Sequence, residues 1–397
     1  MKKILLLGGS AQQIIAIETA KRLGYYTILC DYLPDNPGQN YADKFYQEST
    51  TDKETILKIA QEERIDGILA YASDPAAPTA AYVSEKMNLP GIPFDSAEIL
   101  CNKDKFRKFL SDNGFNSPKS QGYDSANLAK NEISKFDLPV IIKPVDSSGS
   151  KGVTVLFSVE RADEAIEYAF SFSRLKKIII EEFIEKNHDY LIGGDIMVLD
   201  GRVVLWGLLN CHRDNNVNPL VPVGKSYPLL IKQSDTERIK RALQKLINKL
   251  RISNAAMNGE LVVDKNDKVW FLDIGPRNGG NMIPDLLGYI FKTDIVEMTV
   301  KMAMGEKMNV EKLEGDSYYA TYNLHSNKNG IFNGIMFSEE IEPNIMKKFL
   351  YKKVGDKIEY FDNASKAIGI VFLKFENHKQ MMEVLENVEQ HIKVQSL

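Results

Sequence analysis

Two acidic residues, Glu260 and Asp273, stand inside apolar runs that read "NGELVVD" and "WFLDIG". The polar segment "DKNDK" separates the runs, so an antiparallel hairpin would bring the two carboxylates side by side. An unpaired charge is costly in apolar surroundings, and a bound cation is the usual remedy. Mg²⁺ takes oxygen ligands from one or two carboxylates together with substrate phosphates. The two acids therefore predict a magnesium site, and a pair of structural salt bridges is the alternative.

A guanidinium follows this hairpin, because Arg277 lies just beyond Asp273 in "GPRNGG". Its planar fork of donors suits the oxygens of a phosphoryl group or an acyl phosphate. The neighbouring glycines keep the backbone around it open. Arg277 is therefore a candidate catalytic and substrate-binding residue.

A second candidate site lies in "PVIIKPVDSSGSKGVTVLF", where Lys143 ends a strand and a small polar loop follows. Glycine and serine add little bulk, so the backbone N–H groups of such a loop can approach an anion closely. The loop is not a Walker A motif, because GxxxxGK[ST] is absent and the loop joins two strands. We expect the loop to cover nucleotide phosphates and Lys143 to contact them; an ordinary flexible hairpin is the alternative. The loop residues in this prediction are Ser147, Ser148, Gly149, Ser150 and Gly152.

A third candidate site is the strand end "IIIEEFI", which carries Glu181 and Glu182. If the chain forms a hinge here, its backbone can offer one C=O and one N–H to an adenine edge. A nearby carboxylate can accept hydrogen bonds from both ribose hydroxyls, and Asp189 is the candidate for that role. A solvated strand end is the alternative reading of these acids.

Further residues are candidate substrate contacts. Gly9 and Ser10 lie at a strand-to-helix turn, where a helix N-terminus can bind a carboxylate. Ser73 and Asp74 open another helix at the same edge. Residues 210–222 read as a long polar loop that contains His212 and Arg213. For these positions, helix capping and ordinary loop polarity are the alternatives.

The elements that must position these residues fall into three regions. Residues 1–95 alternate short apolar strands with helices, which is typical of a parallel sheet covered on both faces. From 117 to 185 the pattern is a small β-α-β-α-β unit, and longer strands follow from 188 to about 320, with helices at 234–250 and 292–304. Residues 321–397 read as a separate α+β cap with a helix over 377–393.

Bulk composition excludes several classes of function. The chain has 397 residues, of which 44% are hydrophobic and 26% charged, and no run is long enough to span a bilayer. A net charge of −4 gives no footprint for nucleic acid or an anionic membrane. Cys30, Cys101 and Cys211 are widely spaced, without a CxxC pair or a Cys/His cluster. We expect a cytoplasmic protein without disulfides or a zinc site.

The order of these parts resembles the ATP-grasp superfamily, and more narrowly the branch that contains the carbamoyl-phosphate synthetase large chain, biotin carboxylase and the carboxylate–amine ligases. The shared parts are a basic residue on a helix ("NKDKFRKFL"), a lysine before a Gly/Ser loop, an EE hinge, two acids on a late hairpin, and then PR. The resemblance implies an α/β and α+β multidomain fold. Its parts are a Rossmann-like pre-grasp domain (1–100), a two-lobed ATP-grasp domain (101–320, with a small lid lobe at about 115–187) and a C-terminal α+β cap (321–397).

The resemblance also implies roles for single residues. Lys103, with Lys105 as the fallback, would be the first basic residue on the nucleotide and Lys143 the second. Glu181 and the backbone of Phe183 and Ile184 would hold adenine, and Asp189 the ribose. Glu260 and Asp273 would bind Mg²⁺, with Mn²⁺ as an alternative ion. Two positions depart from the pattern: Asp273 stands where Glu is common, and Gly275 replaces an Asn that often completes the metal set.

The activity implied by the resemblance is ATP-dependent ligation in biosynthesis. A small-molecule carboxylate is activated as an acyl phosphate, ADP is released, and an amine or similar nucleophile displaces phosphate. Carboxylation with bicarbonate is an alternative within the family, and a non-catalytic nucleotide-binding protein is an alternative outside it. "LLLGGSAQQ" with Asp31 also suggests an NAD(P)-dependent oxidoreductase, although Gln13 occupies the place of the third glycine of GxGxxG. Homodimers are common in the resembled branch, and the sequence leaves the oligomeric state open.

Overall fold

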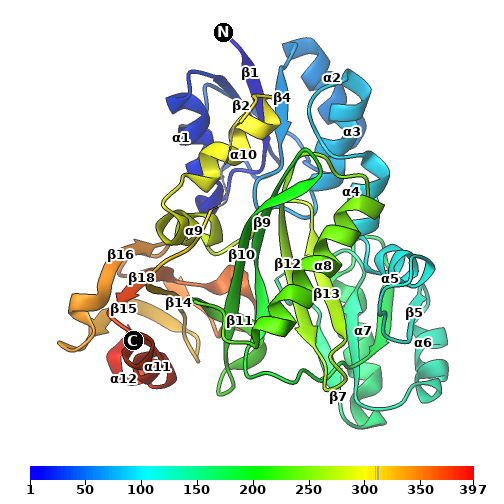
Figure 1. Ribbon diagram of the computed structural model, residues 1–397, viewed down its shortest axis with the longest axis vertical. Helices are drawn as coiled ribbons and strands as arrows, with labels where there is room; N and C mark the ends of the chain where they lie inside the picture. The colour runs from blue at the N-terminus through cyan, green and yellow to red at the C-terminus, as the bar shows by residue number, and fades with distance from the viewer. Residues whose placement is uncertain (148, 309, 311–312) are drawn as a thin grey trace.

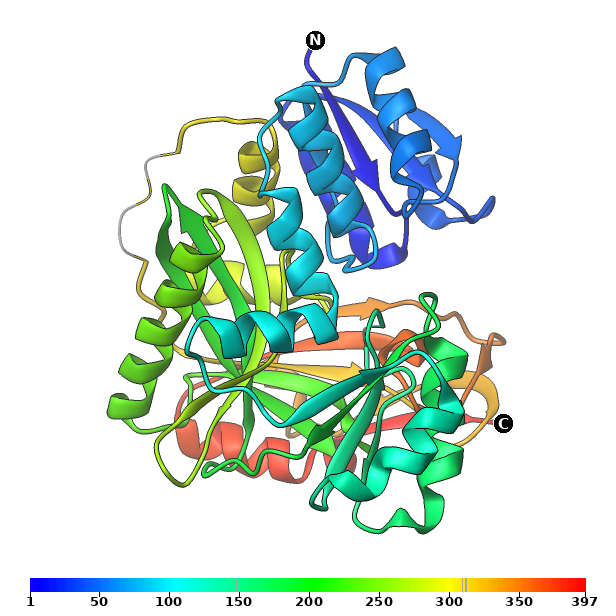
Figure 2. The same ribbon diagram turned by 90° about the vertical axis from the view of Figure 1, so that its right-hand side faces the viewer.

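A computed structural model describes residues 1–147, 149–308, 310 and 313–397. Figure 1 shows the N-terminal sheet at the top, a long central sheet below it, and a small lobe around α5, α6 and α7 to the lower right. The C-terminal strands and α11 lie on the other side of the central sheet. The view in Figure 2 shows the small lobe facing the central sheet beneath the N-terminal domain. Within the described residues, no helix combines the length and apolar character needed to cross a membrane.

The N-terminal region is a four-stranded parallel sheet with the strand order β3-β2-β1-β4. The strands are β1 (Lys3–Leu7), β2 (Tyr26–Asp31), β3 (Lys44–Gln47) and β4 (Gly67–Leu69). Helices α1 (Ile14–Arg22), α2 (Lys53–Glu63) and α3 (Ala77–Met87) accompany them. The expected parallel α/β region is confirmed, although β3 and α2 were absent from the sequence prediction.

A helix from much later in the chain covers one face of this sheet. Val296 and Val300 of α10 (Ile295–Ala303) share a buried cluster with Ile4 and Leu6 of β1. Burial of such aliphatic side chains contributes about 1.5–3 kcal/mol each, so the contact fixes the first domain to the rest of the protein. This long-range packing explains why β1 is apolar on both faces.

Two helices lead from the first domain into the lid lobe: α4 (Phe94–Cys101) and α5 (Lys103–Asp112). The lobe is an antiparallel sheet with the order β5-β8-β6-β7, backed by two helices. Its elements are β5 (Ser120–Tyr123), α6 (Ala126–Glu132), β6 (Val140–Pro144), β7 (Thr154–Leu156), α7 (Ala162–Phe172) and β8 (Ile178–Glu182). In chain order these elements read β-α-β-β-α-β, so the predicted β-α-β-α-β unit has two strands, β6 and β7, between its helices.

The central sheet has eight strands in the order β13-β12-β9-β10-β11-β14-β18-β16. Its first five strands are β9 (Leu191–Leu199), β10 (Arg202–Asp214), β11 (Asn218–Tyr227), β12 (Ala255–Val263) and β13 (Val269–Gly275). Helix α8 (Gln233–Lys249) packs with α4 and α5 on one face. Helices α9 (Ile283–Phe291) and α10 cover part of the opposite face, and the remainder of that face carries the polar residues described below.

Three sequence expectations are wrong in their local structure. Residues 210–222 do not form a loop, because β10 and β11 form a long hairpin there. Several polar side chains of this hairpin form hydrogen bonds with other residues of the sheet. The helix expected over 292–304 begins at residue 295 and is preceded by the separate helix α9. The helix expected over 377–393 divides into α11 (His378–Glu386) and α12 (Val388–His391), and β19 (Ile392–Ser396) follows.

The C-terminal region adds strands to the central sheet. β14 (Tyr318–Leu324) pairs with both β11 and β18 (Gly369–Phe375), and β16 (Ile345–Leu350) pairs with β18. β15 (Gly330–Phe337), β17 (Lys357–Ile358) and β19 form a smaller sheet. Residue 320 lies within β14, and the central sheet continues through this strand. The boundary expected between the ATP-grasp domain and the C-terminal cap at this residue stays a prediction.

The contact between β4 and α10 leads to a stability prediction. A Cβ atom on Gly67 would lie 2.4 Å from the carbonyl oxygen of Ala303, which is backbone and cannot move aside alone. We expect Gly67→Val to lower the free energy of unfolding by about 1–3 kcal/mol through overpacking, measured by thermal or urea unfolding. Lys58→Ala on exposed α2 is the control, and it should stay within about 0.5 kcal/mol. An unchanged melting temperature for Gly67→Val would contradict the described docking of α10.

Candidate active site

The two acids identified in the sequence are direct cross-strand partners. Glu260 of β12 pairs with Asp273 of β13, and it also pairs with Gly193 of β9. Side chains of paired residues leave the same face of a sheet, so the two carboxylates stand side by side. We call Glu260 and Asp273 the acid pair. Their face of the sheet is the one that α9 covers further along.

Each member of the acid pair has a cation as its partner. Lys103 Nζ lies 3.2 Å from Asp273 Oδ2, and Arg213 Nη2 lies 3.3 Å from Glu260 Oε1. Burial would raise the pKa of Asp273, but Lys103, together with Lys143 and Arg107, outweighs this effect and holds the pKa below its usual value. Asp273 is thus kept as an anion, which is the state in which a carboxylate binds a divalent ion.

Lys103 also joins the acid pair to the loop that follows β6. It is the first residue of α5, and its Nζ donates a 3.0 Å hydrogen bond to the carbonyl of Ser147. Burial lowers the pKa of Lys103, but Asp273 and Asp74 raise it to a net value above normal. The fallback residue, Lys105, pairs instead with Glu98 at the surface. The structure therefore brings Lys103 to the acid pair and leaves Lys105 outside it.

Lys143 belongs to a buried cluster of three charges. Lys143 Nζ lies 2.7 Å from Glu181 Oε2, and Arg107 Nε lies 2.8 Å from Glu181 Oε1. Lys143 is 7% exposed, Glu181 2% and Arg107 3%, so water screens the interactions between these charges little. Burial would raise the pKa of Glu181, yet Arg107 and Lys143 hold it below its usual value. For Lys143, burial lowers the pKa and Glu181 only partly restores it.

The sequence analysis did not identify Arg107 as a residue of the site. It donates to the carbonyls of Phe271 (2.9 Å) and Leu272 (2.6 Å), so it binds the free edge of β13 next to Asp273. A spacing of four residues puts Arg107 on the same face of α5 as Lys103, and this spacing was the available signal. Glu181 thus holds two cations in place, whereas its predicted contact with adenine is not tested.

The loop of residues 147–152, which we call the glycine loop, reaches the central sheet. Ser150 Oγ donates a 2.8 Å hydrogen bond to the carbonyl of Leu220 on β11. Gly149, Ser150 and Gly152 all have positive φ angles, of 68°, 62° and 73°, a conformation that glycine adopts readily. The loop therefore extends from the lid lobe over the face that carries the acid pair. Ser148 lies outside the described residues.

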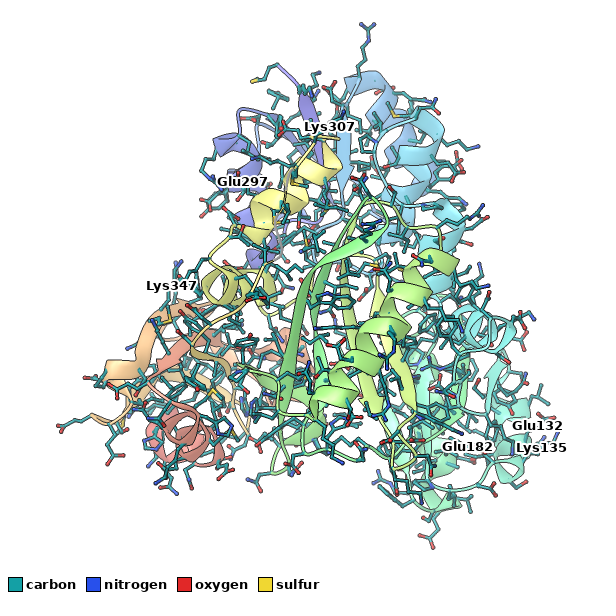
Figure 3. All side chains as sticks on the ribbon, viewed as in Figure 1. Glu132, Lys135, Glu182, Glu297, Lys307 and Lys347 are labelled. Carbon is teal, nitrogen blue, oxygen red and sulfur yellow. The ribbon has the colours of Figure 1, made fainter. Side chains whose placement is uncertain are left out.

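The predicted hinge residues lie at the edge of the lid lobe. Glu182 forms a 3.6 Å ion pair with Lys119, and Figure 3 shows it near Glu132 and Lys135 at the outer end of that lobe. The N–H of Phe183 donates to the carbonyl of Pro139 at 3.0 Å, so this donor is already used. Ile184 is half-buried and Asp189 is exposed. Their contacts with adenine and ribose stay predictions.

Arg277 is held by the first domain. Its Nη2 forms an ion pair with Asp74, which follows Ser73 in the loop before α3, and its Nη1 donates to the Asn278 carbonyl at 3.0 Å. Its Nε is buried, and no hydrogen-bond partner for it lies among the residues described. Burial lowers the pKa of Arg277, but Asp74 more than reverses this effect.

The departure at Gly275 has a steric cause. A Cβ atom at this position would lie 2.5 Å from Asp74 Oδ1 and 3.2 Å from the guanidinium carbon of Arg277. The carboxylate of Asp74 thus fills the space that any larger side chain would need. The ion pair between Asp74 and Arg277 therefore requires a glycine at position 275.

A second missed residue, Asp195 on β9, fixes the loop after Arg277. Its fully buried carboxylate accepts hydrogen bonds from the N–H of Gly279 (2.9 Å) and from Asn258 Nδ2 (2.8 Å). Burial raises the pKa of Asp195. Gln12 Oε1 accepts from the N–H of Asn281 at 3.0 Å, so the turn after β1 lies against the same loop.

Gly9, Ser10 and His212 each have a hydrogen-bond partner other than the acid pair. The N–H of Gly9 donates to Asp31 (2.7 Å), and Ser10 donates to Gln13 (2.9 Å). His212 Nε2 lies 2.8 Å from Ser226 Oγ, whereas its neighbour Arg213 reaches Glu260. This alternation is what a strand produces. The structure brings Arg213 to the acid pair and does not bring Gly9, Ser10 or His212 there; their substrate contacts are untested.

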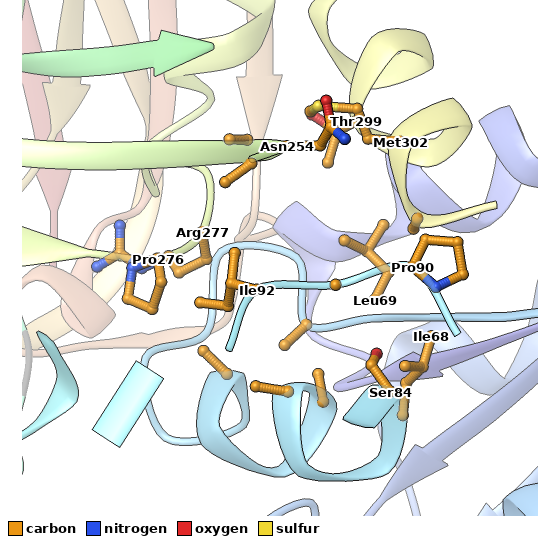
Figure 4. Close-up of a pocket in the computed structure, with 18 of the residues that line it drawn as sticks. Ile68, Leu69, Ser84, Pro90, Ile92, Asn254, Pro276, Arg277, Thr299 and Met302 are labelled. Atoms are coloured by element: carbon orange, nitrogen blue, oxygen red, sulfur yellow. The ribbon is translucent and has the colours of Figure 1, made fainter. Parts of the chain in front are cut away.

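A small cavity of about 90 Å³ lies behind Arg277, between the first domain and the central sheet. Figure 4 shows Ile68, Leu69 and Pro90 on one side and Pro276 with Arg277 on the other. Its lining is mostly small and apolar. We assign it no ligand.

Comparison with known proteins agrees with this arrangement, since residues 100–281 match the family model of the ATP-grasp domain. This part of the chain is an ATP-grasp domain. The carbamoyl phosphate synthase large chain of Clostridium botulinum is 25% identical over 303 residues, covering 74% of this chain and 27% of that relative. The chain thus spans about a quarter of the length of this relative.

Two solved structures share the fold of this chain over its whole length. L-amino acid ligase from Bacillus licheniformis has a TM-score of 0.83 at 18% identity, with 100% of this chain and 99% of that chain covered. Phosphoribosylglycinamide synthetase from Anaerococcus prevotii has a TM-score of 0.75 at 22% identity, with both chains fully covered. The multidomain α/β and α+β fold expected from the sequence is confirmed.

The acid pair of the ATP-grasp domain has the chemistry of a magnesium site. It supplies two adjacent carboxylates, and Mg²⁺ commonly takes one or two of these with waters and phosphates. No group of three or more Asp, Glu, His or Cys side chains around one point is found in the described part of the chain. Because Gly275 has no side chain to contribute, the residues fit one ion that a substrate must help to ligate.

The steric conflict at Gly275 is testable by a double-mutant cycle. We expect Gly275→Asn, which restores the residue common in the family, to destabilise the fold by about 1–3 kcal/mol because the new side chain displaces Asp74. Asp74→Ala should recover part of this loss in the double variant, so the two changes are non-additive. Thermal unfolding of the four proteins measures the coupling. Strictly additive effects on the free energy of unfolding would show that residue 275 and Asp74 do not interact.

His212 leads to a prediction about pH. Burial, helped by Lys225 and Arg213, lowers the pKa of His212 to about 4, against about 6.5 in an unfolded chain. Because the folded pKa is the lower one, its contribution to stability is complete above about pH 6.5 and is lost as the pH falls towards 4. Allowing for partial exposure, we expect about 2 kcal/mol from this residue.

Urea unfolding between pH 4 and 7 measures this contribution of His212. The variant His212→Gln should have a shallower pH dependence than the wild type. The exposed His378→Gln is the matched control and should keep the wild-type slope. Identical slopes for the wild type and His212→Gln would contradict a buried neutral imidazole.

Proposed function

We propose that this protein is an ADP-forming carbon–nitrogen ligase that activates a small-molecule carboxylate with ATP and joins it to an amine. One observation carries the proposal: Lys103 bonds both to Asp273 of the acid pair and to the carbonyl of Ser147 in the glycine loop. A divalent-ion site, a cation and a loop suited to phosphates therefore converge at one point. Phosphoryl transfer needs this kind of positioning and charge compensation.

The residues divide the work of phosphoryl transfer between them. Glu260 and Asp273 would hold Mg²⁺, which neutralises phosphate charge when it is bound. Lys103 and Lys143 place positive charge beside the acid pair, and Arg107 with Glu181 fixes the position of Lys143. The glycine loop covers the site and keeps water away from the activated acyl group.

The chemical step balances without a protein nucleophile. A carboxylate oxygen of the substrate forms a bond to the γ-phosphorus, while the bond from that phosphorus to the bridging oxygen breaks and its electron pair leaves with ADP. The amine then adds to the acyl carbon, loses a proton and displaces inorganic phosphate. Arg277 binds phosphoryl oxygens in this scheme. Asp74, which is paired with Arg277 in the free protein, is placed to accept the cationic amine.

Similarity to the ligases described above supports this reaction class, in particular the likeness to an L-amino acid ligase and a phosphoribosylglycinamide synthetase. Similarity to carbamoyl phosphate synthase favours bicarbonate as a second candidate acyl substrate. We propose a role in biosynthesis with ATP and Mg²⁺, with Mn²⁺ able to replace magnesium. Pairing of the chain into a homodimer stays a prediction.

A screen for ADP release distinguishes these candidates. Purified protein with Mg-ATP is given paired carboxylates and amines, and separately bicarbonate, while ADP, phosphate and pyrophosphate are measured. Release of phosphate and ADP with an organic carboxylate supports acyl phosphate chemistry, whereas pyrophosphate would indicate an adenylate. ADP release with bicarbonate alone selects the second candidate. Nucleotide binding without turnover for every substrate pair would favour a non-catalytic nucleotide-binding protein. Oxidation of NAD(P)H by any of the candidate substrates would favour a dehydrogenase.

Asp273 provides the sharpest test of the metal site. We expect Asp273→Asn to lower magnesium-dependent ADP release roughly a hundredfold or more, because it removes one of two anionic ligands. The matched control is Asp267→Asn on the turn of the same hairpin, where the side chain pairs with Arg238 and not with the site. Activity with manganese in place of magnesium is measured in parallel. Wild-type turnover of Asp273→Asn would remove Asp273 from the metal site.

A further inference from the structure

Lys225 is a buried amine on the floor of the active site. It lies on β11, where it pairs with Cys211 of β10, and only 5% of its surface is exposed. Its Nζ lies 2.7 Å from Cys211 Sγ. Among the residues described, no carboxylate comes within ion-pair distance of this ammonium. A buried cation without an anionic partner is costly unless a ligand supplies the charge.

Gly193 provides the space that the Lys225 amine occupies. A Cβ atom on Gly193 would lie 2.7 Å from Cys211 Sγ and 3.1 Å from Lys225 Nζ, so a larger residue would displace the amine. Gly193 is itself the cross-strand partner of Glu260. Lys225 therefore extends across β10 to the row of residues that carries the metal-binding acid, on the same face of the sheet.

Arg213, on the same face of the sheet as Lys225, is a second cation, and one of its nitrogens lacks a partner among the described residues. Its Nη2 contacts Glu260, while its Nη1 is buried and lacks a hydrogen-bond partner within the described residues. Arg213 thus shares its one carboxylate partner with the metal ion that Glu260 would also bind. Binding of Mg²⁺ by Glu260 would leave this corner with still more uncompensated positive charge.

We infer that Lys225 and Arg213 form an oxyanion pocket that binds the carboxylate group of the acyl substrate. This inference rests on the proposed ligase function. The strand order β13-β12-β9-β10-β11 places Asp273 and Lys103 on one side of Glu260 and Lys225 on the other. Lys103, which bonds to Ser147 of the glycine loop, serves the nucleotide phosphates in this proposal, so the Lys225 side receives a second anion.

The pocket meets a need of the proposed reaction. Attack of a carboxylate on a phosphate brings two anions together, and their repulsion must be offset by fixed positive charge. Lys225 offers this charge from a position set by packing before the substrate arrives. The pocket recognises the carboxylate itself and admits either an organic acid or bicarbonate, two sources that the experiment separates.

Bromide provides a probe that does not depend on knowing the substrate. Crystals with Mg-AMP-PNP are soaked in sodium bromide, and the anomalous signal near Lys225 Nζ is measured. We expect bromide there in the wild type and in Lys374→Met, which removes an exposed lysine from β18, separated from β11 by β14 in the sheet. We expect its loss in Lys225→Met, whose side chain has similar length and suits a buried site. An empty pocket in the wild type, or bromide retained in Lys225→Met, overturns the inference.

Two solution measurements separate this inference from its rivals. For Lys225→Met, the Kd for Mg-AMP-PNP should stay within about twofold, while the KM for the carboxylate or bicarbonate that supports ADP release should rise about tenfold or more. A tenfold loss of nucleotide affinity instead would assign Lys225 to the triphosphate. Cys211→Ala should retain bromide, and its loss there would make the thiol the binding group. If the wild type binds no nucleotide, the ligase proposal fails, and the bromide result still decides the role of Lys225.

Discussion

The antiparallel register of β12 and β13 puts Glu260 and Asp273 side by side, and the other charged groups of the site are arranged around this pair. Two carboxylates at this spacing repel each other unless cations or a metal ion compensate them. Lys103 comes from α5 and Arg213 from β10, so each acid is compensated by a different element. A one-residue slip of the hairpin would send one carboxylate to the opposite face and separate the pair.

One buried and one half-buried ion pair connect the separate parts of the chain to this centre. Glu181 of the lid lobe binds Arg107 of α5, which also binds the backbone edge of β13. Asp74 of the first domain binds Arg277 beyond the end of β13. Breaking the buried pair of Glu181 and Arg107 leaves an uncompensated buried charge and costs about 3–5 kcal/mol, whereas breaking the half-buried pair costs less. Both contacts help to define how the domains meet. The position of the lid lobe and that of the first domain are thus coupled to the same hairpin.

Local sequence predicted the parts of the site that local rules determine. Glu260, Asp273 and Lys143 were visible because acids and a lysine inside apolar runs stand out against the period of a strand. Arg107, Asp195 and Lys225 were missed because their roles depend on partners far away in sequence. "PLVPVGKSYP" contains three prolines and a glycine, so β11 read as a loop, and the alternation that separates His212 from Arg213 was lost with it. The fold was predicted further than the site, since strand and helix periodicity is local and the docking of α10 on β1 is not.

The distribution of charge distinguishes the two sides of the acid pair. On the side of Asp273, each buried cation has a carboxylate partner: Lys103 has Asp273, and Lys143 has Glu181. On the side of Gly193, Lys225 has a thiol as its partner and Arg213 shares Glu260 with the expected metal ion. On the first side, each lysine is thus paired with a carboxylate before any ligand binds, and it must exchange a protein anion for a phosphate. On the second side, Lys225 has no carboxylate partner among the residues described, and the protein leaves its charge for a substrate. A site built in this way favours assembly of both anions over binding of either alone, because each one removes a different electrostatic penalty.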